Sequence, residues 1–146
     1  MARITRWISI IERCALLYRM QSFEELGLNG SQHMYIYYLC NHQEGIMQDA
    51  LAKKVYINKS NAARNIKALL DKGFVKREKD SKDLRVYKIY PTAKAFAVLP
   101  KIKEKMGIFN LEITKQMSEE EVIALESALK KVALNASSYI EEYYEE

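Results

Sequence analysis

Polar and basic side chains recur on one side of the segment that begins at Lys59. If this segment is a helix, Ala62, Ile66 and Leu69 share its buried side. The opposite side then presents Lys59, Ser60, Asn61, Arg64, Asn65 and Lys67. Arginine can donate two hydrogen bonds to guanine and asparagine can pair similarly with adenine, whereas serine and lysine suit phosphates. An ordinary amphipathic surface helix would show the same periodicity, but these residue types favour contact with double-stranded DNA.

The most charged stretch, KREKDSKDLR at residues 76–85, contains five Lys or Arg and three Asp or Glu. The flanking FVKRE and RVYKIY are typical of strands, and the polar KDSKDL between them predicts a hairpin. A solvated turn would account for Glu78 and Ser81. We expect at least one of Lys82 and Arg85 to contact DNA from the hairpin tip, since both are cations.

Two short helices must position the polar face described above. Residues 48–55 and 59–72 both have helical apolar spacing, and the three residues between them allow only a tight turn. Asn58 is a good N-cap for the second helix, and Gly73 is a good terminator. Helix, tight turn, helix and hairpin in this order predict a winged helix-turn-helix.

Two further helices are expected before this unit. Apolar residues spaced by three and four from Ile4 to Tyr18 predict a first helix of five or six turns. Asn29 and Gln32 have the spacing of a capping box, which predicts a second helix from there to about Asn41.

Another helix is expected after the hairpin. Pro91 should end the second strand, and Thr92 should cap a helix that runs toward Gln116. Pro100 and Gly107 are the positions where this helix would kink or break.

The last helix should be about 25 residues long. Ser118 and Glu121 form a capping box, and apolar residues then repeat at helical spacing as far as Tyr143. Such a helix carries more apolar surface than a small domain can cover, so we expect the terminal helices to pack against a second copy of the chain.

The length and the hydrophobic content of 49% favour a single domain over residues 1–146. The order of the predicted elements makes this domain mainly α with a small β-hairpin wing. We expect residues 29–92 to form the DNA-binding lobe, and residues 1–28 and 93–146 a helical dimerisation region. The net charge is +4, and the basic residues are densest from Lys53 to Lys94. That distribution is typical of a nucleic-acid partner.

Several other classes are disfavoured. The apolar runs are too short to span a bilayer, and the first residues lack a secretory signal, so a cytoplasmic protein is expected. No Gly-rich phosphate loop or nucleophile motif is present, so we expect neither an enzyme nor a cofactor. His33 and His42, even with Cys40, do not complete a tetrahedral set, so no metal is expected.

The residues described so far resemble those of the MarR family of bacterial transcriptional regulators. The resemblance covers about 65 residues, from LGLNGSQ through DALAKKVYINKSNAARNIKALLDKGFVKREKDSKDLRVYKIYPT. Its most specific part is DSKDLR followed by Thr92, which is similar to the family's wing signature Asp-x-Arg-Asp-x-Arg and the threonine after the second strand. Asp80, Asp83 and Arg85 match that signature directly.

The resemblance implies that Arg85 or a neighbour enters the minor groove and that Asp83 orients an arginine through a salt bridge. Three positions depart from the family pattern: Lys82 replaces an arginine, Pro91 a leucine and Ala95 a glycine. Lys82 keeps the charge but lacks the planar fork of arginine, so its contact with DNA should be weaker.

Cys14 raises the question of a signal. Some MarR-like proteins sense peroxides through a cysteine in the first helix, and Tyr18 and Tyr37 could tune its reactivity. Cys14 lies on the apolar stripe, however, and we expect it to act as a small core hydrophobe. The tyrosines, with several methionines, could instead line a pocket for a small aromatic or apolar effector.

These observations predict a sequence-specific DNA-binding transcriptional regulator. It should act as a repressor that binds a pseudo-palindromic operator as a homodimer, and a small molecule or an oxidative signal would relieve it. The alternative is a winged-helix protein-interaction module that does not bind DNA sequence-specifically.

Overall fold

The computed structural model describes the backbone of residues 1–144 and the side chains of residues 1–141. It contains two compact units, Met1–Phe109 and Asn110–Glu146. Residues 145 and 146 of the predicted dimerisation region, and the side chain of Tyr143, lie outside the described residues. No helix within the described part is both long enough and apolar enough to cross a membrane.

The first unit begins with α1 (Ile4–Ser22), which is followed by the 3₁₀ turn η1 (Glu24–Leu26) and by α2 (Gln32–Asn41). The predicted start of α2 is wrong by two residues, because Ser31 rather than Asn29 is the N-cap. Half of the predicted capping box is nevertheless present. The Gln32 Oε1 atom accepts a hydrogen bond of 3.2 Å from the Asn29 backbone N–H, so these residues fix the chain that enters α2.

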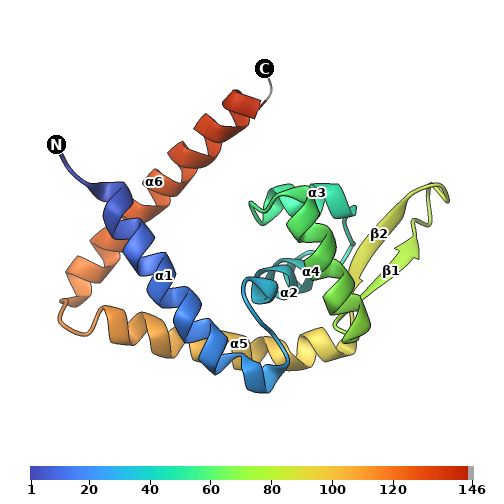
Figure 1. Ribbon diagram of the computed structural model, residues 1–146, viewed down its shortest axis with the longest axis horizontal. Helices are drawn as coiled ribbons and strands as arrows, with labels where there is room; N and C mark the ends of the chain where they lie inside the picture. Colours follow the sequence, from blue (N-terminus) through green and yellow to red (C-terminus); the bar gives the residue numbers. More distant parts are fainter. Residues whose placement is uncertain (145–146) are drawn as a thin grey trace. The chain divides into compact units, whose positions relative to one another are not determined.

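The helix-turn-helix consists of α3 (Gln48–Lys54) and α4 (Lys59–Asp71), as predicted (Figure 1). Asn58 is the N-cap of α4, and its Oδ1 atom accepts a hydrogen bond of 2.9 Å from the Asn61 backbone N–H. This bond satisfies one of the N–H groups that the first turn of a helix leaves unpaired. Gly73 lies just beyond α4 at a φ of 79°, which confirms it as the predicted terminator.

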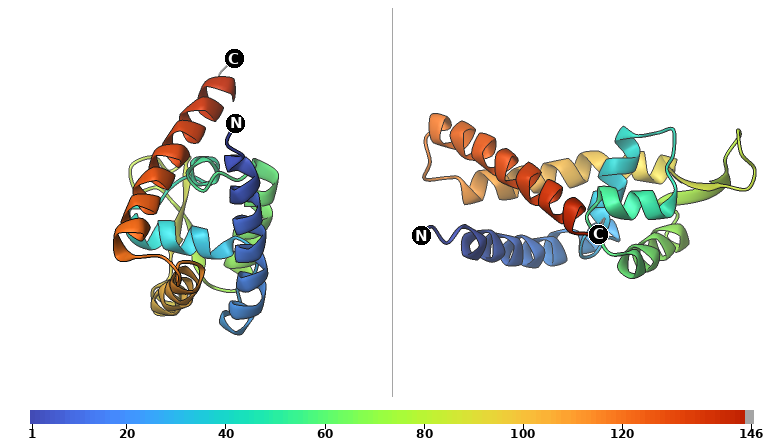
Figure 2. Two further views of the ribbon diagram at one scale, coloured as in Figure 1. Left: turned by 90° about the vertical axis from the view of Figure 1, so that its left-hand side faces the viewer. Right: turned by 90° about the horizontal axis from the view of Figure 1, so that it is seen from above.

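The hairpin pairs β1 (Val75–Lys79) with β2 (Tyr87–Pro91) in antiparallel register. Both strands begin one or two residues later than the sequence predicts. The right-hand view of Figure 2 shows the hairpin extending beyond α4. Ile46 also exchanges two backbone hydrogen bonds with Ile89, of 3.2 and 2.8 Å, so the segment before α3 is attached to the wing.

The helix after the hairpin is α5 (Ala93–Ile113), which continues through Pro100 and Gly107 without a break. Thr92 directly precedes α5, as predicted, and its carbonyl accepts a hydrogen bond of 3.2 Å from the Phe96 N–H, but its side chain does not cap the helix. Its single hydroxyl proton is instead shared between the backbone carbonyls of Gly73, at 2.6 Å, and Phe74, at 3.0 Å. Thr92 therefore ties the start of α5 to the residues that follow α4.

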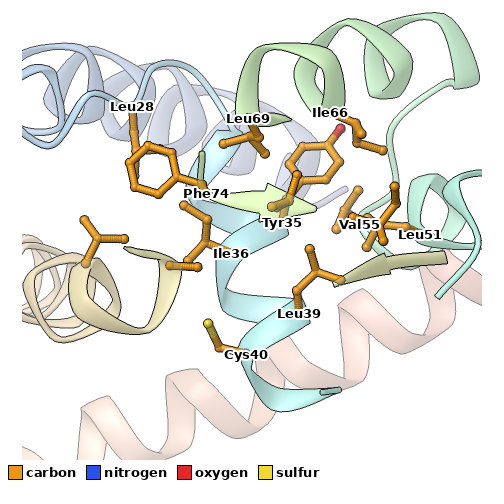
Figure 3. Close-up of a cluster of buried hydrophobic side chains, with 14 of the residues drawn as sticks. Leu28, Tyr35, Ile36, Leu39, Cys40, Leu51, Val55, Ile66, Leu69 and Phe74 are labelled. Carbon is orange, nitrogen blue, oxygen red and sulfur yellow. The ribbon is translucent and has the colours of Figure 1, made fainter. Parts of the chain in front are cut away.

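One hydrophobic core holds the helix-turn-helix and the hairpin together. Figure 3 shows side chains from α2, α3 and α4, together with Phe74 just before β1, converging around Tyr35. The fully buried side chains at its centre are Phe23, Tyr35, Ile36, Leu39, Leu51, Ile66, Leu69, Phe74, Ile89 and Ile102. Ala62, Ile66 and Leu69 of α4 are buried as predicted, so the polar face of α4 points away from this core.

The second unit contains the end of α5 and α6 (Glu119–Tyr144). The capping box at the start of α6 is confirmed. Ser118 Oγ accepts a hydrogen bond of 3.1 Å from the Glu121 N–H, and the Glu121 carboxylate accepts one of 3.2 Å from the Ser118 N–H. The apolar positions of α6 that are exposed include Ile123, Leu125, Leu129 and Leu134.

Candidate nucleic-acid interface

The polar face of α4 is presented to solvent largely as the sequence predicts. Lys59, Ser60, Arg64 and Lys67 are exposed, and Asn61 is half-buried. The Arg64 guanidinium donates a hydrogen bond to the Asn61 side-chain oxygen, one turn earlier. Because the backbone of Asn61 is itself held by the Asn58 cap, this bond holds Arg64 along the first turns of α4. Donors near a helix N-terminus are the ones that reach base edges when a helix enters the major groove.

Asn65 differs from the other members of this face. Its side chain is half-buried, and its Nδ2 atom donates a hydrogen bond of 3.5 Å to the Tyr35 hydroxyl. Asn65 is therefore only partly presented outward, and its expected contact with DNA stays a prediction. Burial raises the pKa of Tyr35, so the hydroxyl remains protonated. Asn65 links the polar face to the core, and a bond to an adenine would compete with this contact.

Two ion pairs occupy the ends of α4. Lys59 lies 3.6 Å from Asp49 of α3, and Lys67 lies 3.3 Å from Asp71, one turn later. All four side chains are largely exposed. Exposed pairs of this kind contribute little to stability, about 0–1 kcal/mol. Both lysines can therefore exchange their carboxylate partner for a phosphate at small cost.

The hairpin tip holds a preformed arginine–carboxylate pair. The Asp83 carboxylate accepts hydrogen bonds from Arg85 Nε at 3.0 Å, from Arg85 Nη2 at 3.2 Å and from the Arg85 backbone N–H at 3.1 Å. The bond from the Arg85 side chain, followed by the backbone bond, lowers the pKa of Asp83. The salt bridge that the family resemblance implied is present, and the Arg85 side chain is 90% exposed.

Asp80, which matches the family's wing signature but was not among the predicted DNA-binding residues, builds the turn that carries this pair. Its carboxylate accepts a hydrogen bond of 3.3 Å from the Asp83 N–H and lies 3.5 Å from Lys88 Nζ. The Asp80 backbone N–H in turn donates to the Val86 carbonyl at 2.8 Å. The Asp-x-x-Asp spacing was the available signal, because aspartates commonly accept hydrogen bonds from backbone N–H groups a few residues later in turns. Lys82 is exposed, and within the described residues it takes part in no ion pair.

The stem of the hairpin adds cations that the sequence-based set missed. The Arg77 guanidinium lies 4.7 Å from the centre of the Tyr87 ring, and Lys76 Nζ lies 5.9 Å from the Tyr90 ring. Such contacts hold long basic side chains against the strand. The available signal was the basic content of the predicted strand itself; the register, which sets Lys76 opposite Tyr90 and Arg77 opposite Ile89, is seen only in the structure.

The effector candidates are not brought together by any hydrogen bond within the described residues. Cys14 is exposed, so the expectation that it is a core residue is wrong for a single chain, where the stripe of α1 is uncovered. The Tyr18 hydroxyl donates to the Lys105 carbonyl at 2.8 Å. Tyr37 is half exposed, and its ring lies 5.7 Å from Lys103 Nζ.

A hollow of about 430 Å³ lies on the first unit, next to the Glu25–Lys105 ion pair. Its lining residues are Glu25, Leu26, Lys101, Glu104, Lys105 and Ile108. None of these is a tyrosine or methionine that we expected around an apolar effector, so such an effector stays a prediction.

Residues 28–87 match the model of the MarR family. The transcriptional regulator SlyA, whose crystal structure is known, is 30% identical in sequence to this chain. The match covers 96% of this chain and 98% of that chain, and the two structures superpose with a TM-score of 0.88. A MarR-type regulator from Listeria monocytogenes, crystallised with a 26mer DNA, is 29% identical over 97% of this chain and 96% of its own, with a TM-score of 0.87. The uncharacterised HTH-type regulator YybA of Bacillus subtilis is 28% identical, over 90% of this chain and 87% of its own length.

Proposed function

The chain belongs to the MarR family and is therefore a transcriptional regulator rather than an enzyme, and from this premise we propose that it binds a pseudo-palindromic DNA operator as a homodimer. The observation that carries the proposal is the combination of the polar face of α4 with the Asp83–Arg85 pair at the wing tip. The Listeria regulator that was crystallised with DNA supports it by similarity.

In this proposal α4 enters the major groove, which is about 12 Å wide and admits one α-helix. Arg64 and Asn61 contact base edges from the first turns of α4. Lys59, Ser60 and Lys67 contact phosphates, because they lie at the ends of the exposed face. Asn65 contacts a base only if it gives up its bond to Tyr35.

The wing contacts the neighbouring minor groove. A narrow A·T-rich minor groove attracts arginine because its negative potential is enhanced. Asp83 is repelled by DNA, but it holds the Arg85 side chain in one geometry. Arg85 therefore loses less side-chain entropy when it binds DNA. Lys82 adds a weaker phosphate contact from the same turn.

The exposed apolar faces of α1 and α6 support the homodimer. Trp7 is 60% exposed on α1, where Ile4 and Ile11 lie on the same face. On α6, Leu125 and Leu129 are spaced by one turn and are also exposed. A two-fold dimer would present two copies of α4, and such dimers bind half-sites about 34–36 Å apart, or a multiple of this spacing.

We further propose that the bound dimer represses transcription and that a small molecule or oxidation of Cys14 relieves the repression. Either signal would act by favouring a state in which the two copies of α4 no longer match the half-site spacing. A reporter gene behind the operator should be more active when this protein is deleted. In a purified system, mild peroxide should weaken DNA binding of the wild type and leave Cys14→Ser unchanged if oxidation is the signal.

Salt dependence tests the DNA-binding proposal. If the protein makes six to ten phosphate contacts, its affinity for an operator duplex should fall by about 10³–10⁵ between 50 and 200 mM salt. The measurement is a fluorescence anisotropy titration with a duplex from upstream of its own gene. No binding, or an affinity that salt leaves unchanged, would favour a protein-interaction module instead.

A further inference from the structure

The two faces of the hairpin stem carry different sets of side chains. In the antiparallel register Lys79 lies opposite Tyr87, and Arg77 lies opposite Ile89. Residues that pair in this way, and every second residue along a strand, lie on the same face of the ribbon. Arg77, Lys79 and Tyr87 therefore share one face of the stem, and we call these three side chains the inner-face cluster. This face turns toward the core, because Ile89 on it is only 1% exposed.

The inner face is also the one that lies toward α4. At the base of the stem, Val75 and Ile89 pack in the same core as Ile66 and Leu69 of α4. Figure 1 shows the hairpin beside α4, with its tip beyond the helix. The inner-face cluster lies farther along the ribbon than these buried residues, and its Tyr87 is 44% exposed. A partner that covers both α4 and the wing tip would therefore run past this cluster.

Positive charge is unpaired on the inner face and paired on the opposite one. On the opposite face Lys76 lies 3.2 Å from Glu78, and Lys88 lies 3.5 Å from Asp80. Within the described residues, neither cation of the inner-face cluster takes part in an ion pair. The stem therefore presents uncompensated positive charge only on the face toward α4.

An aromatic ring holds these two cations in place. The Arg77 guanidinium lies 4.7 Å from the centre of the Tyr87 ring, and Lys79 Nζ lies 6.0 Å from it. A cation at such a distance over a ring is attracted to its electron-rich face. The ring carries no net charge, so both cations keep their full charge for an anionic partner.

The proposed DNA complex places a sugar–phosphate strand at this position. If α4 lies in the major groove and Arg85 in the neighbouring minor groove, one backbone strand separates the two grooves. That strand has to pass between the helix and the wing tip, along the inner face of the stem. Arginine and lysine are the usual partners of its phosphate oxygens.

We propose that the inner-face cluster binds this strand: Arg77 and Lys79 contact neighbouring phosphates, and Tyr87 is a positioning residue that holds both cations. This inference rests on the proposed DNA binding and adds to it a contact outside the α4 face and the wing tip. The contact carries no base preference, because it is made to the backbone alone. It holds the stem against the duplex, so that Arg85 stays in the minor groove.

Substitutions of single cations compare the two faces. Arg77→Ala should weaken binding to operator and random duplexes alike, by about tenfold. It should also lower the slope of log affinity against log salt by about 0.9, the value for one lost phosphate contact. Lys88→Ala is the control, because it removes the same charge from the opposite face, where Asp80 already neutralises it. This variant should keep the affinity and the salt slope of the wild type.

Tyr87 is tested through the cations that it positions. Tyr87→Leu should weaken binding about threefold, and Tyr87→Phe, which restores a ring, should recover the affinity. In a background that carries both Arg77→Ala and Lys79→Ala, Tyr87→Leu should cause no further loss. A ring that only stabilised the hairpin would cause the same loss with and without the cations.

The measurements are anisotropy titrations of the full-length protein between about 50 and 200 mM salt, with thermal unfolding of each variant. Equal losses of affinity and equal slopes in Arg77→Ala and Lys88→Ala would overturn the inference, because the two faces would then be equivalent. An undiminished effect of Tyr87→Leu in the absence of both cations would overturn the positioning role. If the wild type bound no duplex, the proposed function itself would fail; if it bound with a steep salt dependence that Arg77→Ala left unchanged, only this inference would.

Discussion

The core of the helix-turn-helix and the apolar faces of α1 and α6 are built from the same residue types but differ in what covers them. Leu69 and Ile66 of α4 are almost fully buried within one chain. Leu129 of α6 and Trp7 of α1 are exposed. The first region can be stable by itself, since its apolar surface is already removed from water. The second requires another surface, which we propose to be a second copy of the chain.

The largest expected effect on stability is that of a cavity in the core of the helix-turn-helix. Leu69→Ala should lower the free energy of unfolding by about 2–5 kcal/mol, because the side chain is fully buried in a packed core. Leu129→Ala is the matched control. Its cost should appear only at protein concentrations that favour the dimer, in denaturant titrations at two concentrations. Equal, concentration-independent losses in both variants would contradict the distinction between the two regions.

A smaller effect of up to about 3 kcal/mol is expected from His33, which lies beside Phe23 at the start of α2. Burial, followed by the charge of Arg19, lowers the pKa of His33 from 6.5 to about 4, and Glu12 opposes this. The unfolded chain therefore binds the proton more readily. Stability should be complete above about pH 6.5 and decrease as the pH falls toward 4.

His33→Phe tests this expectation, because it keeps a ring beside Phe23 and removes the titrating group. Unfolding measured from pH 7 to 4 should show a shallower decline in the variant than in the wild type. If the stability of the wild type fell with the same slope as that of His33→Phe, carboxylates rather than His33 would determine the pH dependence.

Gly45 lies in the loop that joins the buried core to the wing. Gly45→Ala should lower the free energy of unfolding by about 1–3 kcal/mol. Gly45 has a φ of 78°, and an added Cβ would lie 2.5 Å from the Tyr90 ring. Gly30→Ala is the control, because Gly30 also has positive φ but an added Cβ there meets nothing within 4 Å. Thermal unfolding should rank Gly45→Ala as the more damaging change. The reverse order would mean that Tyr90 does not pack closely on this loop.

The smallest expected effects on stability are those on the polar surface. Arg64→Ala and Lys82→Ala should each change unfolding by less than about 0.5 kcal/mol, because both side chains are exposed. Arg64→Ala should nevertheless weaken operator binding by about 1–3 kcal/mol and relax base preference, whereas Lys82→Ala should weaken all duplexes alike. Equal losses on operator and random DNA for both variants would contradict the assignment of α4 to the major groove.

Local features of the fold could be predicted from the sequence. The Asn58 cap, the Ser118–Glu121 capping box and the Gly73 terminator each depend on residues within a few positions of one another. The helix-turn-helix and the hairpin followed from periodicity for the same reason. Their order, together with DSKDLR, was enough to indicate the family.

Features that depend on distant residues could not be predicted. The Thr92 side chain bonds to Gly73 and Phe74, about twenty residues earlier in the chain, and not to the first turn of α5. Asn65 is half-buried and hydrogen-bonded to Tyr35 of α2, thirty residues earlier in the chain. Cys14 had the spacing of a core residue, but no periodicity tells whether an apolar stripe is covered by its own chain or by another one.

The most direct test of the central claim is the selection of bound sites from random duplexes by the full-length protein. If the terminal helices of two chains pair, the dimer carries two DNA-binding lobes. The bound sites should then be enriched in an inverted repeat, with half-sites about one helical turn apart. Enrichment of a single, unrepeated half-site would contradict the dimer, and the absence of any enriched sequence would contradict sequence-specific DNA binding itself.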